Sequence, residues 1–385
     1  MALKKITGSM VLAVFLGIAM SFFSRREVSL TISYTLNYEG DSWQKNRTGF
    51  LWALSYLGAE LPKGCFDKSL DWIDSTTFKI RFHELGFNDQ ALQVLEAITD
   101  SIKNTRQYRK YNSIDLGQFI ALTIGSSPHY YAITGVPAHY ADFSGKHGSS
   151  AKQVFPLLHS TVAMHNRRLS FSAADSVLNT IFVAEEGSGD LALGQFKPQY
   201  YEVMDVMPNG QLRFAVYDGQ GNLADASPKS LGAAGKPAKC VWCHELVFQP
   251  LFEITDSLPD SMSPAQFGEL VNHQNKLLDE YRRTLHSEIN FENKQDHTFM
   301  ELIYISYMEP SLRRLSKEWH MSEHRLKRIL RHEKLHQHPE FDFLKDCYAR
   351  RDVNPHAPCR WIEVSEDIRE PSNYEPSYLA KLRKQ

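Results

Sequence analysis

The sequence predicts an α+β fold with a mixed N-terminal region, a β-rich central segment and an α-helical C-terminal domain. Alternating apolar residues near the N-terminus indicate a strand, and helical apolar periods follow it. Strand-like runs around an Asn-Gly turn occupy the central part, and amphipathic helical patterns occupy the last third. With 385 residues, 42% hydrophobic and 23% charged, the chain has the composition of a folded protein larger than one ordinary domain.

Residues 1–26 predict an export signal or an N-terminal membrane anchor. Lys4 and Lys5 precede an uncharged apolar run over residues 6–23, and Arg25 and Arg26 follow it. As a helix this run spans about 27 Å, longer than a usual signal-peptide core and slightly short of a bilayer. We expect a protein of the periplasm or cell envelope, and we favour an uncleaved anchor in the inner membrane over a cleaved signal.

The mixed N-terminal region is predicted over residues 27–149. Residues 29–38 alternate apolar and polar side chains, which is typical of a half-buried strand. An apolar stripe over residues 88–108 predicts a helix with Asn88 as its N-cap, and residues 115–124 predict a shorter helix. Pro, Gly and Ser residues between 135 and 150 predict a long surface loop, where we place the domain boundary.

The strand-rich segment is predicted over residues 150–255. Residues 200–206 and 212–217 are rich in Tyr, Val and Phe, and the Asn209-Gly210 pair between them predicts a hairpin turn. Residues 234–238 are Ala, Gly, Lys and Pro and predict an exposed loop that leads to Cys240. We therefore expect Cys240 to lie at the edge of a sheet.

The helical C-terminal domain is predicted over residues 256–385. Apolar residues recur at a 3.6-residue period between 264 and 285, and further helices are predicted over residues 296–308 and 321–332. We expect these helices to form a bundle. The tail from Glu363 is polar and is expected to wrap around the surface.

The most specific motif is C-x-x-C-H, which Cys240, Cys243 and His244 form. Two thiols at this spacing can each add to one vinyl group of a protoporphyrin, and the adjacent imidazole then ligates the iron. Independent draws from this composition would place the pattern in roughly 0.3% of such chains. The sequence thus predicts one covalently bound haem c.

Two alternatives use the same thiols. A redox dithiol would sit at the head of a helix, whereas the predicted loop precedes Cys240. A structural zinc site would need a second pair at ligand spacing, and Cys347 and Cys359 stand too far apart for that. In an oxidising compartment we expect Cys347 and Cys359 to form a disulfide, which would stabilise the fold by roughly 3 kcal/mol, with two free buried thiols as the alternative.

In its motif and its predicted export the chain resembles the monohaem c-type cytochromes, which are generally assembled outside the cytoplasmic membrane. This resemblance implies electron transfer with a redox partner protein. The order of hairpin then C-x-x-C-H is also similar to cytochrome P460, a β-rich monohaem family, over the strand-rich segment only. That likeness implies a haem enzyme or small-ligand sensor with an open distal site, and Lys197 is one candidate for the family's haem-crosslinking lysine.

The sixth haem ligand separates these two functions, because a Met or His there is typical of electron carriers. Several Met and His side chains are candidates: Met204, Met207, Met262, His273, Met300, Met308, His159, Met164 and His165. Three lysines near the motif, Lys229, Lys236 and Lys239, could steer an acidic redox partner or simply solubilise the chain. We expect Trp242 to pack on the porphyrin or on its sheet support.

A weaker motif, H-E-x-x-H, is formed by His332, Glu333 and His336. On a helix this pattern binds zinc in peptidases, with the Glu as general base, although chance would supply it in roughly 4% of such chains. A zinc-dependent peptidase is therefore a third hypothesis. The net charge of −2 favours no nucleic-acid partner.

Overall fold

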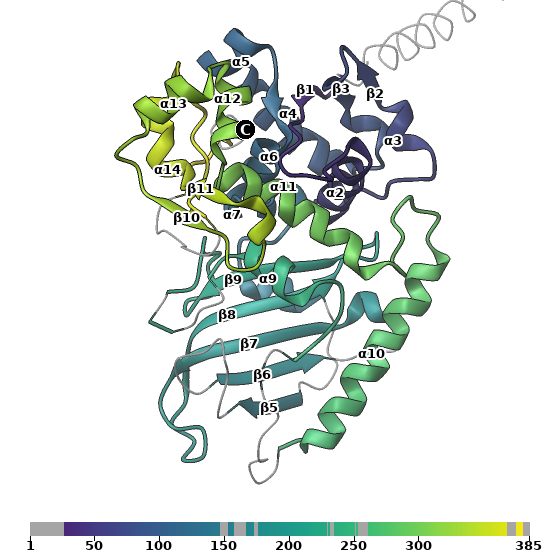
Figure 1. Ribbon diagram of the computed structural model, residues 1–385. Coiled ribbons are helices and arrows are strands. Elements are labelled where there is room, and N and C mark those ends of the chain that lie inside the picture. The colour runs from purple at the N-terminus through teal and green to yellow at the C-terminus, as the bar shows by residue number, and fades with distance from the viewer. Residues whose placement is uncertain are drawn as a thin grey trace, which may run out of the picture.

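The computed structural model describes residues 27–146, 153–157, 167–172, 176–228, 230–231, 235–250, 252, 261–367 and 375–379. It confirms the predicted α+β class, with 44% helix and 18% strand. Figure 1 shows a five-stranded sheet as the lower layer and a mainly helical layer above it. The predicted export segment, residues 1–26, lies outside the described residues. Within the described part, no helix combines the length and hydropathy needed to cross a membrane.

The upper layer contains a small sheet with the strand order β2-β3-β1-β4. Its strands are β1 (Ser29–Ser33), β2 (Leu70–Trp72), β3 (Thr77–Arg81) and β4 (Ile114–Asp115). β1 ends at Ser33, five residues before the predicted end of this strand. It is also buried on both faces rather than one, because the helices α4 (Asp89–Lys103) and α6 (Leu116–Thr123) pack against it.

Around this sheet lie α2 (Trp43–Tyr56), α3 (Cys65–Lys68), α4 (Asp89–Lys103), α5 (Arg106–Tyr111), α6 (Leu116–Thr123) and α7 (Ser127–Thr134). Helix α8 (Tyr140–Lys146) lies against the lower sheet, where Tyr140 stacks on Tyr201 at a ring-centroid distance of 4.7 Å. Asn88 caps α4 as predicted, accepting a hydrogen bond from the Ala91 N–H at 2.8 Å. The helix predicted over residues 88–108 is two helices, because Thr105 caps a new one by accepting from the Tyr108 N–H. The predicted long loop after residue 135 contains α8.

The first and last parts of the chain share one core. Helix α11 (Thr298–Met308) packs against both α2 and α6. Two glycines permit the close approach: a Cβ at Gly49 would lie 2.6 Å from the Phe299 backbone, and one at Gly117 would lie 2.5 Å from the Tyr307 Cβ. The region before the predicted boundary at 149 and the region after the predicted boundary at 255 therefore pack together. The strands of the large sheet lie between these two regions in the sequence.

The lower sheet is antiparallel, with the order β5-β6-β7-β8-β9. Its strands are β5 (Gln153–Leu157), β6 (Arg167–Ser172), β7 (Ile181–Ser188), β8 (Lys197–Val206) and β9 (Leu212–Asp218). The predicted hairpin joins β8 to β9, and Gly210 adopts a φ of 81° in its turn. The Asn209 side chain also donates to the Ser55 and Ala59 carbonyls, so the turn is docked on the end of α2.

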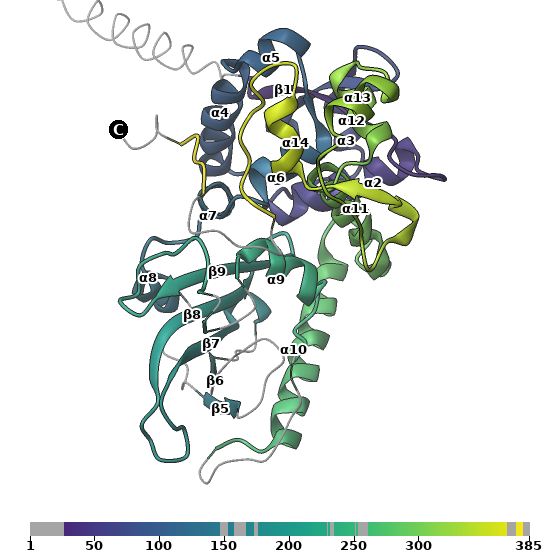
Figure 2. The ribbon, with the colours of Figure 1, turned by 60° about the vertical axis from the view of Figure 1, so that its left-hand side comes forward.

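Helix α10 (Pro264–Thr284) begins at a capping box formed by Ser263 and Gln266. Its apolar face is the predicted one, but α10 does not join a helix bundle. It runs along the side of the large sheet, where Phe267 stacks on Phe155 at a ring-centroid distance of 4.6 Å (Figure 2). The bundle prediction was wrong because the apolar face of α10 packs on the large sheet, through Phe267 against Phe155 and Phe171, and not on other helices.

The C-terminal part contains α12 (Leu312–Trp319), α13 (Glu323–Ile329), β10 (Leu335–Gln337), β11 (Asp346–Tyr348) and α14 (Arg350–Val353). The predicted Cys347–Cys359 disulfide is not formed, and both residues are free thiols. Cys347 is buried in β11 with its Sγ 3.4 Å from the Lys345 carbonyl, and burial raises its pKa to about 12. Part of the tail is docked rather than wrapped loosely, since Leu379 and the Glu375 side chain are buried.

Candidate functional site

The C-x-x-C-H motif lies on helix α9 (Pro237–His244). Proline at the first helical position pre-sets the backbone for helix formation, and Lys236 is the N-cap residue. The prediction of an exposed loop before Cys240 was wrong, because residues 235–238 are buried and the last two belong to the helix. Helix α9 packs against β9, the edge strand of the large sheet, as expected (Figure 1).

Cys240, Cys243 and His244 line one cavity. Residues at i, i+3 and i+4 fall on the same face of an α-helix, so a single face of α9 presents both thiols and the imidazole. Cys243 is exposed, while Cys240 and His244 are half-buried, so the cavity opens to solvent beside the second cysteine. The structure therefore brings together all three residues that the sequence singled out.

The large sheet provides the opposite wall of this cavity. Strand register aligns Phe182, Met204 and Phe214 in one row across β7, β8 and β9, and all three line the cavity. The His244 ring lies 5.5 Å from the Phe214 ring. Helix α10 and the segment after α9 close the remaining sides with Val271, Phe267, Phe248 and Phe252.

Among the candidates for a sixth ligand in the described part of the chain, Met204 is the one that lines this cavity. Met207 is buried against α2, near Gly58, and Met300 is buried inside α11. The other described candidates lie elsewhere: His273 is exposed on α10, Met262 precedes that helix, and Met308 lines a different cavity. His159, Met164 and His165 lie outside the described residues.

The residue types fit an iron porphyrin: two thiols for the vinyl groups, an imidazole, a thioether and an aromatic lining. The volume is about 120 Å³, below the roughly 300–1,000 Å³ of ordinary ligand sites. Attachment of a haem would therefore require the aromatic walls to move apart. The open side beside Cys243 provides the direction for that movement.

Buried charges hold both ends of α9. The Lys236 Nζ forms an ion pair with Glu375 Oε1 at 2.5 Å, both side chains being fully buried, and it also donates to the Glu366 carbonyl at 2.9 Å. Beyond the other end, Arg282 donates to the Leu246 and Gly210 carbonyls, at 2.9 Å each. Burial lowers the pKa of Arg282 to about 10, which leaves it cationic at neutral pH.

Several residues predicted to surround a haem lie elsewhere. Lys236 is buried, so it is not available to steer a partner, and Lys239 is the described lysine that lines the cavity. Lys229 lies outside the described residues. Lys197 is exposed at the start of β8, about 23 Å along the strand from Met204. Trp242 packs edge-on against Tyr304 of α11 at 5.4 Å, so it joins α9 to the helical layer and not to the cavity.

The H-E-x-x-H residues do not form a zinc helix. Helix α13 ends at Ile329, His332 lies in a turn and His336 lies on β10. Glu333 accepts from His356 at 2.8 Å, and His336 contacts Glu309 at 2.9 Å. The described part of the chain contains no group of three His, Cys, Asp or Glu side chains placed to hold a metal ion. The helix predicted over residues 321–332 was therefore too long. His332 and His336 do not lie on one helical face, which the zinc-peptidase hypothesis requires.

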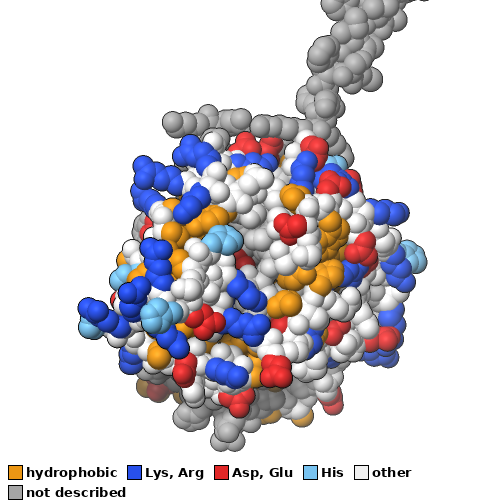
Figure 3. Space-filling model, turned by 45° about the horizontal axis from the view of Figure 1, so that its top comes forward, with side chains coloured by type: hydrophobic (Ala, Val, Ile, Leu, Met, Phe, Trp, Pro, Cys, Tyr) orange, Lys and Arg blue, Asp and Glu red, His pale blue; other side chains and the backbone are white. Residues whose placement is uncertain are grey.

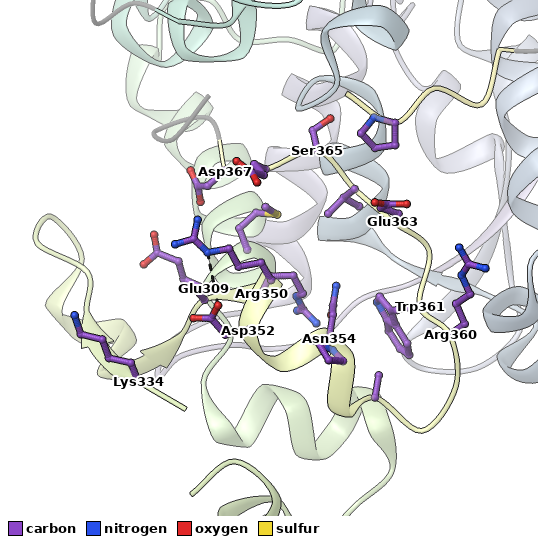
Figure 4. Close-up of a pocket in the computed structure, with 18 of the residues that line it drawn as sticks. Glu309, Lys334, Arg350, Asp352, Asn354, Arg360, Trp361, Glu363, Ser365 and Asp367 are labelled. Atoms are coloured by element: carbon purple, nitrogen blue, oxygen red, sulfur yellow. Dashed lines mark ion pairs between the residues drawn. The ribbon is translucent and has the colours of Figure 1, made fainter. Parts of the chain in front are cut away.

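A larger cavity, about 930 Å³, lies between α14 and the segment 359–367 (Figure 4). Acidic and basic groups alternate on its walls, with Glu309 and Lys334 on one side and Glu363 on the other. Its buried arginine, Arg350, is already bound by Glu318 and the Tyr307 carbonyl. The cavity shares no lining residue with the site on α9, and it gathers no catalytic set.

Comparison with protein-family models, with curated proteins and with solved structures finds no match. The function of this chain is therefore argued from the site itself. The sequence offered Met204 as one of several candidate ligands, but it could not reveal Glu375 or Arg282, since no motif marks them.

Proposed function

We propose that the protein holds one covalent haem c through thioethers from Cys240 and Cys243, with His244 as axial iron ligand, and that it transfers electrons as an exported cytochrome. One observation carries this proposal: both thiols and the imidazole lie on one face of α9 and line the same aromatic cavity. Each thioether forms when an Sγ–H adds across one vinyl group, so no atom is lost and no oxidant is consumed.

The cavity wall supports a carrier over a catalyst. Met204 projects from β8 into the same cavity, and an iron ligated by His and Met is typical of electron-transfer cytochromes. The rings of Phe182, Phe214 and Phe248 would exclude water from the bound group, which favours its less charged redox state. Lys236 and Arg282 fix α9 from both sides, so the ligand helix is rigidly placed before any haem binds.

A haem enzyme or small-ligand sensor of P460-like type remains the second candidate. The observation that favours it is the wall itself, since a β-sheet and not a helix faces the motif. The two functions differ in the sixth coordination position. Rapid binding of carbon monoxide to the reduced protein would support the open site, and failure to bind would support the six-coordinate carrier.

The test is to produce the full chain together with haem-maturation machinery and to record its intact mass and its pyridine haemochrome spectrum. We expect the mass of the polypeptide plus one haem, and a spectrum typical of two thioethers. Cys240→Ala and Cys243→Ala should each leave a single thioether or none, whereas Cys359→Ala, which lies in the other cavity, should keep full haem content. Colourless protein with the mass of the polypeptide alone would overturn the proposal.

A further inference from the structure

Helices α12 and α13 form a helix-turn-helix unit that the haem site does not use. Three residues, 320–322, join them, and His320 adopts a left-handed φ of 51° in the turn. Ser311 caps α12 and Ser322 caps α13, each accepting a hydrogen bond from a backbone N–H of the first helical turn. A short turn of this kind between two short helices is the arrangement that DNA-binding helix-turn-helix units use.

The elements around this unit join it to the main body and give it an apolar core of its own. Helix α11 precedes it, and the β10–β11 hairpin follows it. Ser311, between α11 and α12, forms an isolated β-bridge with Cys347 of β11, so the chain entering α12 lies beside the two-stranded hairpin. The apolar core of the unit is separate from the main core and is built from Leu315, Trp319, Leu326, Leu330, Tyr348 and Val353.

Helix α12 is the inner helix of the pair. Its Arg314 is buried and contacts Asp115 of the main body, and its Glu318 binds Arg350 at 2.8 Å. Helix α13 buries Leu326 and packs the half-buried Ile329 against the same core, and its other side chains are exposed. The second helix of the unit is thus the exposed one, which is the position of a recognition helix.

The exposed face of α13 and the turn after it carries five cations and one exposed carboxylate, Glu323, at the start of the helix. Arg325, Lys327, Arg328, Arg331 and Lys334 are all exposed, and within the described part of the chain none of them forms an ion pair. Figure 3 shows Lys, Arg and His side chains gathered on the side of the molecule where α12 and α13 lie. We call these five residues the α13 cationic face. A surface of this kind attracts a polyanion, because each contact with a phosphate releases a condensed counterion.

We propose that the α12–α13 unit binds duplex DNA, with α13 against the major groove and the α13 cationic face on the flanking phosphates. The β10–β11 hairpin does not take part. Its Phe343 packs on Tyr38 of the main body at 4.9 Å, and Glu340 and Asp342 beside it would repel phosphates. The net charge of −2 is a sum over the whole chain and does not show that cations gather on α13. For this reason the composition favoured no nucleic-acid partner.

The experiment measures binding of the full chain to a fluorescent mixed-sequence duplex of about 24 base pairs by anisotropy, between about 50 and 200 mM salt. We expect a dissociation constant of about 10⁻⁶–10⁻⁴ M and a steep fall in affinity with salt. The variant Arg325→Gln/Lys327→Gln/Arg328→Gln should bind at least about tenfold more weakly, with a salt slope smaller by about 3. The control Lys276→Gln/Arg283→Gln/Lys294→Gln removes the same charge from exposed positions of α10 and the segment after it, and should bind as wild type.

Circular dichroism shows whether the variants fold, because these side chains are exposed and their loss should leave the spectrum and the melting temperature unchanged. The proposal is overturned if the duplex does not bind at low salt, or if both triple variants lose affinity equally. Equal binding of polyglutamate, or tighter binding of single-stranded DNA, would also overturn it, because neither ligand offers a major groove. The inference does not depend on the haem, and protein without haem serves equally well in this assay. The exported chain that we propose above would meet duplex DNA outside the cytoplasm.

Discussion

The buried ion pair between Lys236 and Glu375 joins the C-terminal tail to the N-cap of α9. Lys236→Ala removes the ammonium group and leaves the Glu375 carboxylate fully buried beside the Ser365 hydroxyl. Burial already raises the pKa of Glu375, and the Lys236 charge opposes that rise. Without Lys236 we expect the carboxyl to take up a proton or the tail to detach.

The expected loss in the free energy of unfolding is about 3–5 kcal/mol, the usual cost of leaving one charge of a buried pair unpaired. Both side chains are completely inaccessible, so solvent screening does not reduce this value. Replacing both partners by apolar residues, Lys236→Met/Glu375→Leu, should restore most of the loss. Urea unfolding at pH 7, followed by tryptophan fluorescence, measures both changes.

A matched control is Lys276→Ala, which breaks an exposed pair with Glu280 at 3.9 Å and should change stability by less than about 1 kcal/mol. Susceptibility of the tail to carboxypeptidase gives a second measure, since detachment should expose Leu379. If Lys236→Ala is as stable as the control and its tail stays protected, the clamp does not hold α9 and the reasoning fails.

His129 is buried as the neutral imidazole, between the Leu122 carbonyl and the Tyr378 N–H, and burial lowers its pKa to about 4. Below about pH 6.5 the unfolded chain therefore binds a proton that the folded chain does not bind. The free energy of unfolding should fall by up to about 3 kcal/mol between pH 6.5 and 4. In His129→Gln the urea midpoint should change less with pH over this range. Gly117→Ala should lower the free energy of unfolding by about 1–3 kcal/mol, because α11 lies against Gly117. The control Gly145→Ala, whose new methyl group would have no atom within 4 Å, should be neutral or slightly stabilising. Thermal melts measure both, and equal effects would contradict the packing described. In haem-loaded protein, Met204→Leu should give a five-coordinate iron that binds carbon monoxide readily. The control Met262→Leu should keep the six-coordinate spectrum. Identical absorption spectra for the two variants would show that Met204 is not the ligand.

Features that depend on neighbours within about one helical turn could be predicted from the sequence. Asn88 caps its helix, the apolar period after residue 264 forms a long amphipathic helix, and the hairpin turns at Gly210. These predictions succeeded because backbone capping and side-chain periodicity are set by a few adjacent residues.

The predictions that failed all depended on what packs against a segment. The H-E-x-x-H residues have a helical spacing, but the chain turns after Ile329 because His338 is buried and β10 pairs with β11. Residues 235–238 have the composition of a loop, yet Lys236 is buried by a carboxylate 139 positions away. Composition around a residue does not contain the identity of such a distant partner.

The sequence by itself determined the fold class, the ends of several helices and the hairpin turn at Gly210. That Cys240, Cys243 and His244 share one helical face came from the structure. Only the tertiary structure decided that Met204 shares their cavity, that Glu375 and Arg282 fix their helix, and that the cations of α13 are gathered on an exposed surface. The physical reason is range. Capping and periodicity act within a turn of helix, whereas burial selects partners from the whole chain by the apolar area and charge that they bring together.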